Sequence, residues 1–284
     1  MSITITHRDD GIAVLTLDQP DSRANVLSTQ LWNDLDAAIK TAGETPNVKG
    51  LIVASAKPGI FIAGADLKLL GDADVGDPRV RAFIDLGTGV LARLESLPFA
   101  TIAAIDGAAL GGGLEVALAC DFRIVGTHPK VMLGLPEVTL GLIPGWGGSQ
   151  RLPRLVGLVR AAEMLTSGKS LSATEAVSAD LATEQVDSAS IIESAAALLA
   201  NLSTTLKSQA RAMKLQPVPE PDRNAYSPTI PQEPVAIHEA MLVLMDGASL
   251  PLAEALKLET DAFCRLAGTP QSKDKIAAFF NRKK

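Results

Sequence analysis

The strongest constraint on the fold is the segment Ile105–Asp121, in which an apolar run meets three consecutive glycines and then a second apolar run. The preceding residues, PFATIAAID, are typical of a buried strand, and Leu114–Ala119 is predicted to be a short helix entered directly from the glycines. The free N–H groups at the start of a helix favour negative charge, and glycines leave them accessible. The segment therefore predicts a strand–turn–helix unit that presents backbone donors to an anionic group.

The first half of the chain repeats this alternation of strand and helix. Strands are predicted over 11–18, 48–54 and 122–125; the run at 48–54 is almost continuously apolar, as in a strand covered on both faces. Ser28 is predicted to cap a helix whose apolar positions recur at helical spacing, and another helix is expected near 79–97. This alternation favours an α/β core with helices packed outside it.

The second half of the chain is predicted to be mainly helical. Helices are expected over 148–167, 172–178, 189–202, 235–247, 250–267 and 273–282. Residues 216–234 contain six prolines in 19 residues, which is typical of an irregular connector. We therefore expect an α/β core in residues 1–215 and a C-terminal helical region in residues 216–284.

Composition and motifs exclude several classes of function. A formal charge of −6 without a basic stripe argues against nucleic-acid binding, and the most apolar stretch is too often interrupted by charges and glycines to span a membrane. Two cysteines, no CxxC and no secretory leader favour a reducing, cytoplasmic location. The three histidines form no cluster with metal-ligand spacing, and neither GxGxxG nor GxSxG occurs.

Two glutamates lie in apolar surroundings next to glycine-rich turns. Glu115 is in the first turn of the predicted helix after the glycines, and Glu137 precedes the loop Leu142–Ser149. Two carboxyl groups in a dry site suit acid–base chemistry, because one can hold its proton while the other gives it up. The structural alternatives are a helix-start glutamate favoured by the dipole at 115 and a capping glutamate at 137. In Phe61–Lys68, small residues after a buried strand open another helix, which could donate a second backbone N–H.

Three segments together resemble the enoyl-CoA hydratase/isomerase (crotonase) superfamily: AGAD, then GGGLE, then PEVTLGLIPGWGGSQRLPRLVG. The resemblance extends from the N-terminal strands to about residue 180. It implies a crotonase-like spiral core of (ββα) repeats followed by a C-terminal helical region. The two glutamates are 22 residues apart, a longer spacing that resembles the hydratase half of multifunctional fatty-acid oxidation proteins. The stretch Phe263–Ser272 is similar to the same half, whereas the Rossmann fingerprint expected of a dehydrogenase half does not occur in this sequence.

The resemblance assigns expected roles to individual residues. The N–H groups of Ala65 and Gly112 would form an oxyanion hole for a thioester enolate, and Gly145 would help to hold the attacking water. Glu137 would deliver a proton to the α-carbon and Glu115 would activate the water, although the family also admits the opposite division. The coenzyme A moiety would contact a set of residues on one wall: Ala24, Ala63, Ala65, Asp66, Leu67 and Lys68.

The implied reaction is hydration of trans-2-enoyl-CoA to 3-hydroxyacyl-CoA in fatty-acid β-oxidation. Double-bond isomerisation from Δ3 to Δ2 and a non-catalytic CoA-binding role remain alternatives. No cofactor or metal is expected, because the substrate itself carries coenzyme A. The family also implies a homo-oligomer, a trimer or a dimer of trimers, and a separate 3-hydroxyacyl-CoA dehydrogenase as a partner.

Trp146 departs from the family pattern, which has a small residue between the glycines of PGxGG. The indole could narrow the acyl pocket, or it could pack behind the loop without touching the substrate. The sequence leaves both interpretations open.

Overall fold

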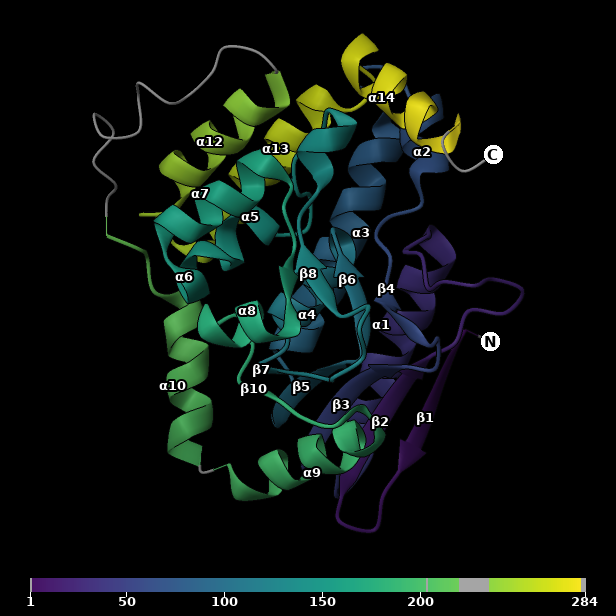
Figure 1. The fold of residues 1–284 in the computed structure, drawn as a ribbon, viewed down its shortest axis with the longest axis vertical. Coiled ribbons are helices and arrows are strands. Elements are labelled where there is room, and N and C mark those ends of the chain that lie inside the picture. The colour runs from purple at the N-terminus through teal and green to yellow at the C-terminus, as the bar shows by residue number, and fades with distance from the viewer. Residues whose placement is uncertain (1, 203, 220–234, 282–284) are drawn as a thin grey trace.

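Two β-sheets form the centre of the protein (Figure 1), whose computed structural model describes residues 2–202, 204–219 and 235–281. One sheet has the strand order β1-β2-β3-β5-β7-β10, and the other has the order β4-β6-β8-β9. The strands are β1 (Ile3–His7), β2 (Ile12–Leu17), β3 (Gly50–Ser55), β4 (Gly59–Ile62), β5 (Ala100–Ile105), β6 (Gly107–Leu110), β7 (Phe122–Val125), β8 (Met132–Gly134), β9 (Leu171–Ser172) and β10 (Glu184–Gln185).

The chain passes from one sheet to the other in a repeating order. β3, β5 and β7 are parallel neighbours in the larger sheet, and the strand that follows each of them, β4, β6 or β8, joins the smaller sheet, again in parallel. Helices follow β4 and β6 before the next strand begins. This is the (ββα)-repeat spiral predicted from the sequence, and the predicted fold class is confirmed.

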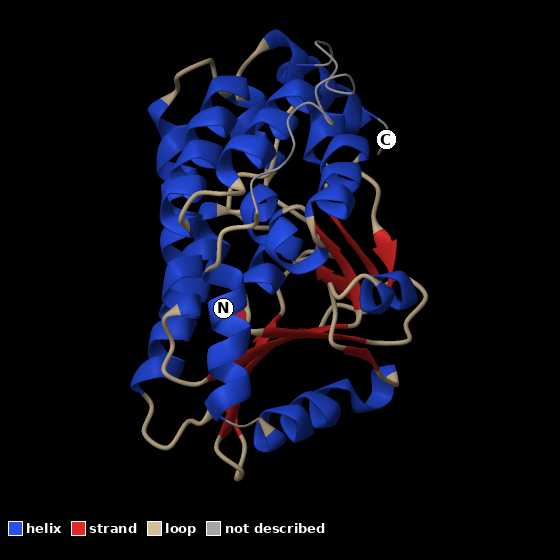
Figure 2. Cartoon of the chain, turned by 90° about the vertical axis from the view of Figure 1, so that its left-hand side faces the viewer, coloured by secondary structure: helices blue, strands red, loops and turns tan. Residues whose placement is uncertain are grey.

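The central strands β2, β3 and β5 of the larger sheet are buried on both faces. One face contributes residues such as Leu15 and Val53 to the main core, and the other face contributes Val14 and Ile52 to a second cluster. That second cluster is closed by helix α9 (Ile191–Asn201), which runs beneath the sheet at the bottom of Figure 2. The apolar run at 48–54 indicated this double coverage.

The remaining helices surround the sheets on their other sides. They are α1 (Thr29–Glu44), α2 (Leu67–Asp72), α3 (Pro78–Glu95), α4 (Gly112–Ala119), α5 (Gly148–Arg151), α6 (Pro153–Val156), α7 (Leu158–Ser167), α8 (Ala173–Ser178), α10 (Thr204–Leu215), α12 (Val235–Gly247), α13 (Leu252–Leu266) and α14 (Pro270–Asn281), with short 3-10 turns η1 (Glu137–Leu140) and η2 (Ser188–Ser190). Ser28 caps α1 as predicted, because its hydroxyl accepts the N–H of Leu31.

The continuous helix predicted over 148–167 is wrong. Three short helices occupy this segment, because Pro153 starts a new one and Gly157 has a φ of +77°. Helix α10 and strands β1, β6, β8, β9 and β10 were not predicted as separate elements.

The C-terminal helices pack directly on the core. α12 contacts α13 and α7, α13 also contacts α3 and α5, and α14 lies against α2, as Figure 1 shows. Buried residues of these helices, among them Leu244, Phe263 and Ile276, belong to the same hydrophobic cluster as α1 and α4. Residues 220–234, which make up most of the predicted connector, lie outside the described residues, and the division at 215 stays a prediction.

Within the described ranges, no single helix is long and apolar enough to cross a membrane. One bent pair, 188–201 with 205–215, passes such a test by length and composition alone.

Candidate active site

One cavity of about 710 Å³ brings the predicted site residues together. Its walls come from the segment before α2, the start of α4, the turn η1, the loop 142–149 and, at α14, the ring pair Phe279 and Phe280. All ten residues assigned a role from the sequence line this cavity: Ala24, Ala63, Ala65, Asp66, Leu67, Lys68, Gly112, Glu115, Glu137 and Gly145. Segments that are far apart in the sequence therefore converge, while the individual roles of these residues stay predictions.

The start of α4 is built from glycines because the backbone turns sharply there. Gly111 precedes the helix with a φ of +54°, a conformation that side chains disfavour. A Cβ on Gly111 would lie 2.8 Å from Oε1 of Glu137 and 3.9 Å from Cα of Gly64. The glycines therefore allow the carboxyl group of Glu137 and the segment before α2 to approach the start of α4.

The backbone N–H groups of Ala65, Gly112 and Gly145 belong to residues of the cavity wall. No hydrogen bond from any of them is found among the residues that the structure describes. Ala65 nevertheless lies in a defined position, because Leu27 N–H donates to the carbonyl of Gly64 and Asp66 N–H donates to the carbonyl of Leu27. Amides held in place without an acceptor can stabilise charge that develops on a substrate oxygen.

Glu115 is buried and is held by the loop opposite. Its Oε1 accepts the N–H of Trp146 at 2.7 Å and that of Gly148 at 2.8 Å. Burial raises the pKa of Glu115 well above its ordinary value, and the nearby carboxylates of Glu259 and Glu137 raise this pKa further. The two N–H groups oppose this shift by stabilising the charged form.

Glu137 is less well satisfied. Its Oε2 is buried without a hydrogen-bond partner among the described residues. Burial is the main reason that the pKa of Glu137 is raised to about 8. The side chain is therefore mostly neutral at pH 7 and can act as a proton donor.

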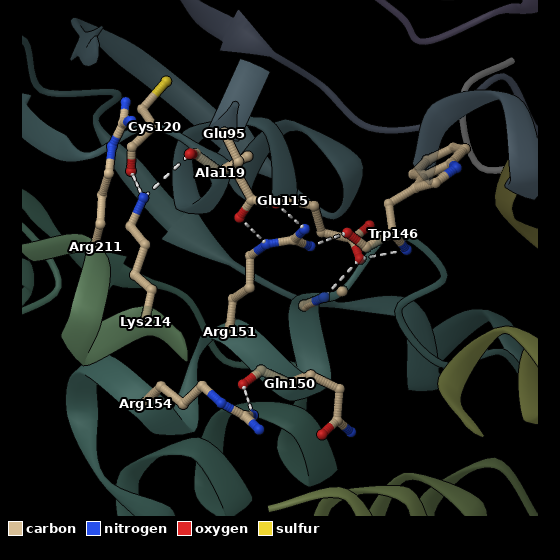
Figure 3. Close-up of polar contacts among 12 residues, drawn as sticks. Glu95, Glu115, Ala119, Cys120, Trp146, Gln150, Arg151, Arg154, Arg211 and Lys214 are labelled. Carbon is tan, nitrogen blue, oxygen red and sulfur yellow. Dashed lines mark hydrogen bonds and ion pairs between the residues drawn. The ribbon is translucent and has the colours of Figure 1, made fainter. Parts of the chain in front are cut away.

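An ion pair between the buried Arg151 and Glu95 contacts the loop that carries Trp146. Arg151 is 1% exposed; its guanidinium donates two hydrogen bonds to Glu95 of α3, at 2.7 and 2.8 Å, and one to the carbonyl of Trp146 at 2.7 Å (Figure 3). Burial opposes the charge of Arg151, but the carboxylate of Glu95 restores it, so that the pKa of Arg151 is raised overall. A side chain at Gly147 would collide with this guanidinium, which accounts for a glycine there.

A third buried carboxylate, Glu259 of α13, was not predicted as a site residue. It accepts the N–H of Gly147 at 2.5 Å and both the N–H and the hydroxyl of Ser149, at 2.8 and 2.5 Å. Burial raises its pKa to about 7. The sequence does carry a signal, because Glu259 falls at helical spacing between Ala255 and Phe263, on the apolar face of the predicted helix 250–267.

Comparison with known proteins shows the family of the chain. The profile of the family described as enoyl-CoA hydratase/isomerase matches residues 7–220. The chain belongs to this family. Among solved structures, an enoyl-CoA hydratase from Bacillus anthracis is 30% identical, with 99% of this chain and 97% of that chain covered and a TM-score of 0.65.

Two other solved structures are similar to this chain. An enoyl-CoA hydratase from Geobacillus kaustophilus is 29% identical over 100% of this chain and 95% of that chain, with a TM-score of 0.64. An enoyl-CoA hydratase from Mycobacterium avium subsp. paratuberculosis is 23% identical over 99% and 96% of the two chains, with a TM-score of 0.73, and so supports the fold.

In this family member, Trp146 both packs in the core and lines the cavity. Its ring is 3% exposed and meets the rings of Trp32 and Phe83 edge-on, with centroids 5.0 and 5.2 Å away. A Cβ on Gly87 would lie 2.3 Å from its Nε1, and a Cβ on Gly112 would lie 2.6 Å from its Cζ3. The indole thus fills space directly beside Gly112.

The far end of α4 is held by buried cations. Lys214 of α10 donates to the carbonyls of Ala119 and Cys120, as Figure 3 shows, and Arg123 donates to those of Ala117 and Cys120. Burial lowers the pKa of Lys214 to about 8. Positive charge at a helix C-terminus is favourable, and here it fixes the helix that carries both Gly112 and Glu115.

No group of three or more histidine, cysteine, aspartate or glutamate side chains suited to a metal ion is found among the described residues of this hydratase/isomerase family member.

Proposed function

We propose that the protein is an enoyl-CoA hydratase, which adds water to trans-2-enoyl-CoA to give 3-hydroxyacyl-CoA. One observation carries the proposal: the carboxyl groups of Glu115 and Glu137 line the same cavity as the acceptor-free N–H groups of Ala65 and Gly112. Hydration of a conjugated thioester needs both an acid and a base, together with donors for the intermediate oxyanion. All of these groups are within one cavity.

The backbone donors would stabilise the enolate. When the oxygen of water bonds to the β-carbon, the electron pair of the double bond moves toward the thioester and negative charge develops on its oxygen. The N–H groups of Ala65 and Gly112 would accept this charge, and a donor of this kind contributes roughly 3–4 kcal/mol in other enzymes. The positive end of the α4 dipole acts in the same direction.

Glu115 would act as the base. Its Oε1 is occupied by the loop amides, whereas its Oε2 accepts no hydrogen bond within the described chain and remains available to a water in the cavity. The N–H of Gly145 would hold the same water. The water would give its proton to Glu115 as its oxygen bonds to the β-carbon.

Glu137 would act as the acid. With a pKa of about 8 it is protonated at neutral pH, and its carboxyl group lies against Gly111 at the start of α4. It would transfer its proton to the α-carbon as the enolate collapses. Proton exchange with solvent then returns Glu115 to its charged form and Glu137 to its neutral form.

The finer biological setting is part of the same proposal. The product, a 3-hydroxyacyl thioester, is the substrate of a 3-hydroxyacyl-CoA dehydrogenase, which would act next in β-oxidation. We also carry over from the sequence a cytoplasmic location, no cofactor beyond the coenzyme A of the substrate, and a homo-oligomer, a trimer or a dimer of trimers. Light scattering at micromolar concentration tests the last point, since a monomer mass would contradict it.

The reaction is tested with purified protein and crotonyl-CoA. We expect the ultraviolet absorbance of the conjugated enoyl thioester to disappear and 3-hydroxybutyryl-CoA to form. A protein that instead converts 3-enoyl-CoA to 2-enoyl-CoA and leaves crotonyl-CoA untouched would be an isomerase. A protein that binds acyl-CoA without either reaction would be a non-catalytic subunit.

A further inference from the structure

The four consecutive amides of residues 146–149 donate alternately to two carboxylates. Trp146 and Gly148 donate to Glu115, whereas Gly147 and Ser149 donate to Glu259. The two sets of bonds reach different helices, because Glu115 belongs to α4 and Glu259 belongs to α13. The conformation that delivers two amides to Glu115 is therefore the conformation that delivers the other two to Glu259.

We propose that Glu259 is a positioning residue for Glu115, acting through the shared loop and through its negative charge. The inference rests on the proposed function for its effect on turnover. It assigns a role in the site to the C-terminal helix α13, whose residues lie outside the motifs at 63–68, 111–115 and 135–149.

The geometry suits positioning better than direct contact with substrate. Glu259 is fully buried and does not line the cavity. Both of its oxygens are used, one by Gly147 and one by the N–H and hydroxyl of Ser149. Gln150 Nε2 donates in turn to that hydroxyl and to the carbonyl of Val243 in α12, so the contact is fixed from both sides.

Burial of a carboxylate at this place needs a reason beyond packing. An unpaired buried charge is strongly unfavourable, and an apolar side chain would fill the same space. The titratable groups that face this region are Glu115 of α4, Glu137 of η1, Arg151 of α5 and Glu95 of α3. Arg151 lowers the pKa of Glu259, and Glu259 in turn is the largest charge that raises the pKa of Glu115.

Four variants separate the two ways in which Glu259 could act. Glu259→Gln removes the charge and one acceptor, whereas Glu259→Asp keeps the charge and withdraws the carboxylate by one methylene. Ser149→Ala removes one donor and leaves the charge of Glu259 in place. Thr260→Val is the matched control, because Thr260 is the adjacent buried residue and its hydroxyl donates only to Leu256 within the helix.

The first measurement is the pH dependence of crotonyl-CoA hydration. We expect Glu259→Gln to lower kcat by about 10- to 100-fold with little change in KM. It should also move the acid limb of the pH profile, which is the fall in activity on the acidic side, to lower pH by about one unit. Glu259→Asp and Ser149→Ala should lower kcat without moving the limb, and Thr260→Val should do neither. A mere loosening of the loop would move the limb to higher pH, since Glu115 would lose two donors.

The result that overturns the proposal is equally definite. A folded Glu259→Gln protein with the kcat and acid limb of the wild type would remove any positioning role. If this variant does not fold, as judged by circular dichroism, Glu259→Asp and Ser149→Ala decide: lowered kcat supports the proposal, and wild-type kcat in both overturns it.

A second measurement needs no activity. The carboxyl group of Glu115 can be titrated by NMR in substrate-free protein with ¹³C-labelled glutamate, its signal being identified by its loss in Glu115→Gln. In Glu259→Gln, Glu115 should titrate at lower pH than in the wild type; an unchanged or higher value contradicts the proposal. A wild-type protein that hydrates no enoyl-CoA would refute the proposed function, while this titration would still decide the role of Glu259.

Discussion

The cavity has two walls that are held in different ways. The wall at residues 63–68 is partly exposed and is fixed by backbone hydrogen bonds to residues 25–27, including Ala63 N–H to the carbonyl of Asn25. The wall at residues 144–149 is entirely buried and is fixed by the side chains of Glu115, Arg151 and Glu259. The first wall is held to residues 25–27 through backbone groups. The second depends on a glutamate 110 residues from Ser149.

This difference suggests that one wall mainly affects substrate binding and the other mainly affects catalysis. A wall held by its own backbone tolerates changes of side chain, so substitutions there should alter binding and leave the chemistry intact. A wall held by buried charges transmits any change to Glu115. We therefore expect variants of the buried wall and its partners to lower kcat, and variants of the exposed wall to raise KM.

The largest effect is expected from the two glutamates. Glu115→Gln and Glu137→Gln keep the size of each side chain but remove the proton transfer, so each should lower kcat by at least about 10²-fold with little change in KM. The double variant should lose much less than the product of the single losses, because both groups act on one substrate. Steady-state kinetics with crotonyl-CoA measures these values. Wild-type rates in both single variants would show that the residues are wrongly assigned.

The next effect is a loss of activity at alkaline pH. Glu137 must carry a proton to act as the acid, and its raised pKa of about 8 means that the proton is present at pH 7 and is lost as the pH rises through 8. We expect kcat/KM to fall by about tenfold per unit above that value. The limb should be missing from the residual activity of Glu137→Gln. A profile that stays flat to pH 9.5 would remove Glu137 from the role of acid.

A moderate effect is expected on chain length from Trp146. Trp146→Leu should open space beside Gly112 and raise the kcat/KM of decenoyl-CoA relative to crotonyl-CoA by about tenfold. Trp32→Leu is the control, because Trp32 packs against the same indole but does not line the cavity. Both variants lose core packing, so their thermal stability should fall together. An equal change in chain-length preference in both would show that Trp146 is a packing residue only.

The smallest effect is expected from the exposed wall. Lys68→Ala removes one exposed cation from the cavity rim, and we expect KM for crotonyl-CoA to rise by about 3- to 5-fold while kcat stays unchanged. Added salt should raise the wild-type KM toward the value of the variant. A fall in kcat of the same size would break the distinction between the two walls.

Sequence reasoning recovered the parts of the site that are local. The strand, the glycines and Glu115 lie within one segment, and Glu137 lies beside the loop it faces. The local sequence is therefore enough to predict how these residues are placed relative to one another. Glu259 could not be placed in the same way, because its partners are set by the packing of α13 against α5. Its position on an apolar helix face was visible in the sequence, but the pattern does not identify the residues that contact this face.

The elements that escaped prediction have physical reasons as well. β9 and β10 have only two residues each, too few for a recognisable alternation. α10 is held to the core mainly through Arg211, Lys214 and Lys207, which donate to Asp121 or to backbone carbonyls. A helix attached by cations has a weak apolar pattern. The backbone carbonyls that accept its hydrogen bonds cannot be identified from the sequence, because every residue has one.

The close approach of Gly87 to Trp146 sets an order in which this pocket could have been acquired. With the indole in place, position 87 is closed to every side chain, since even a methyl group would overlap the ring. With a small residue at 146, alanine at 87 becomes tolerable. A lineage could therefore gain the tryptophan only from an ancestor that already had glycine at 87, and it could return to a larger residue there only after giving the tryptophan up. The residues at positions 87 and 146 are thus coupled, and the order of their substitutions matters.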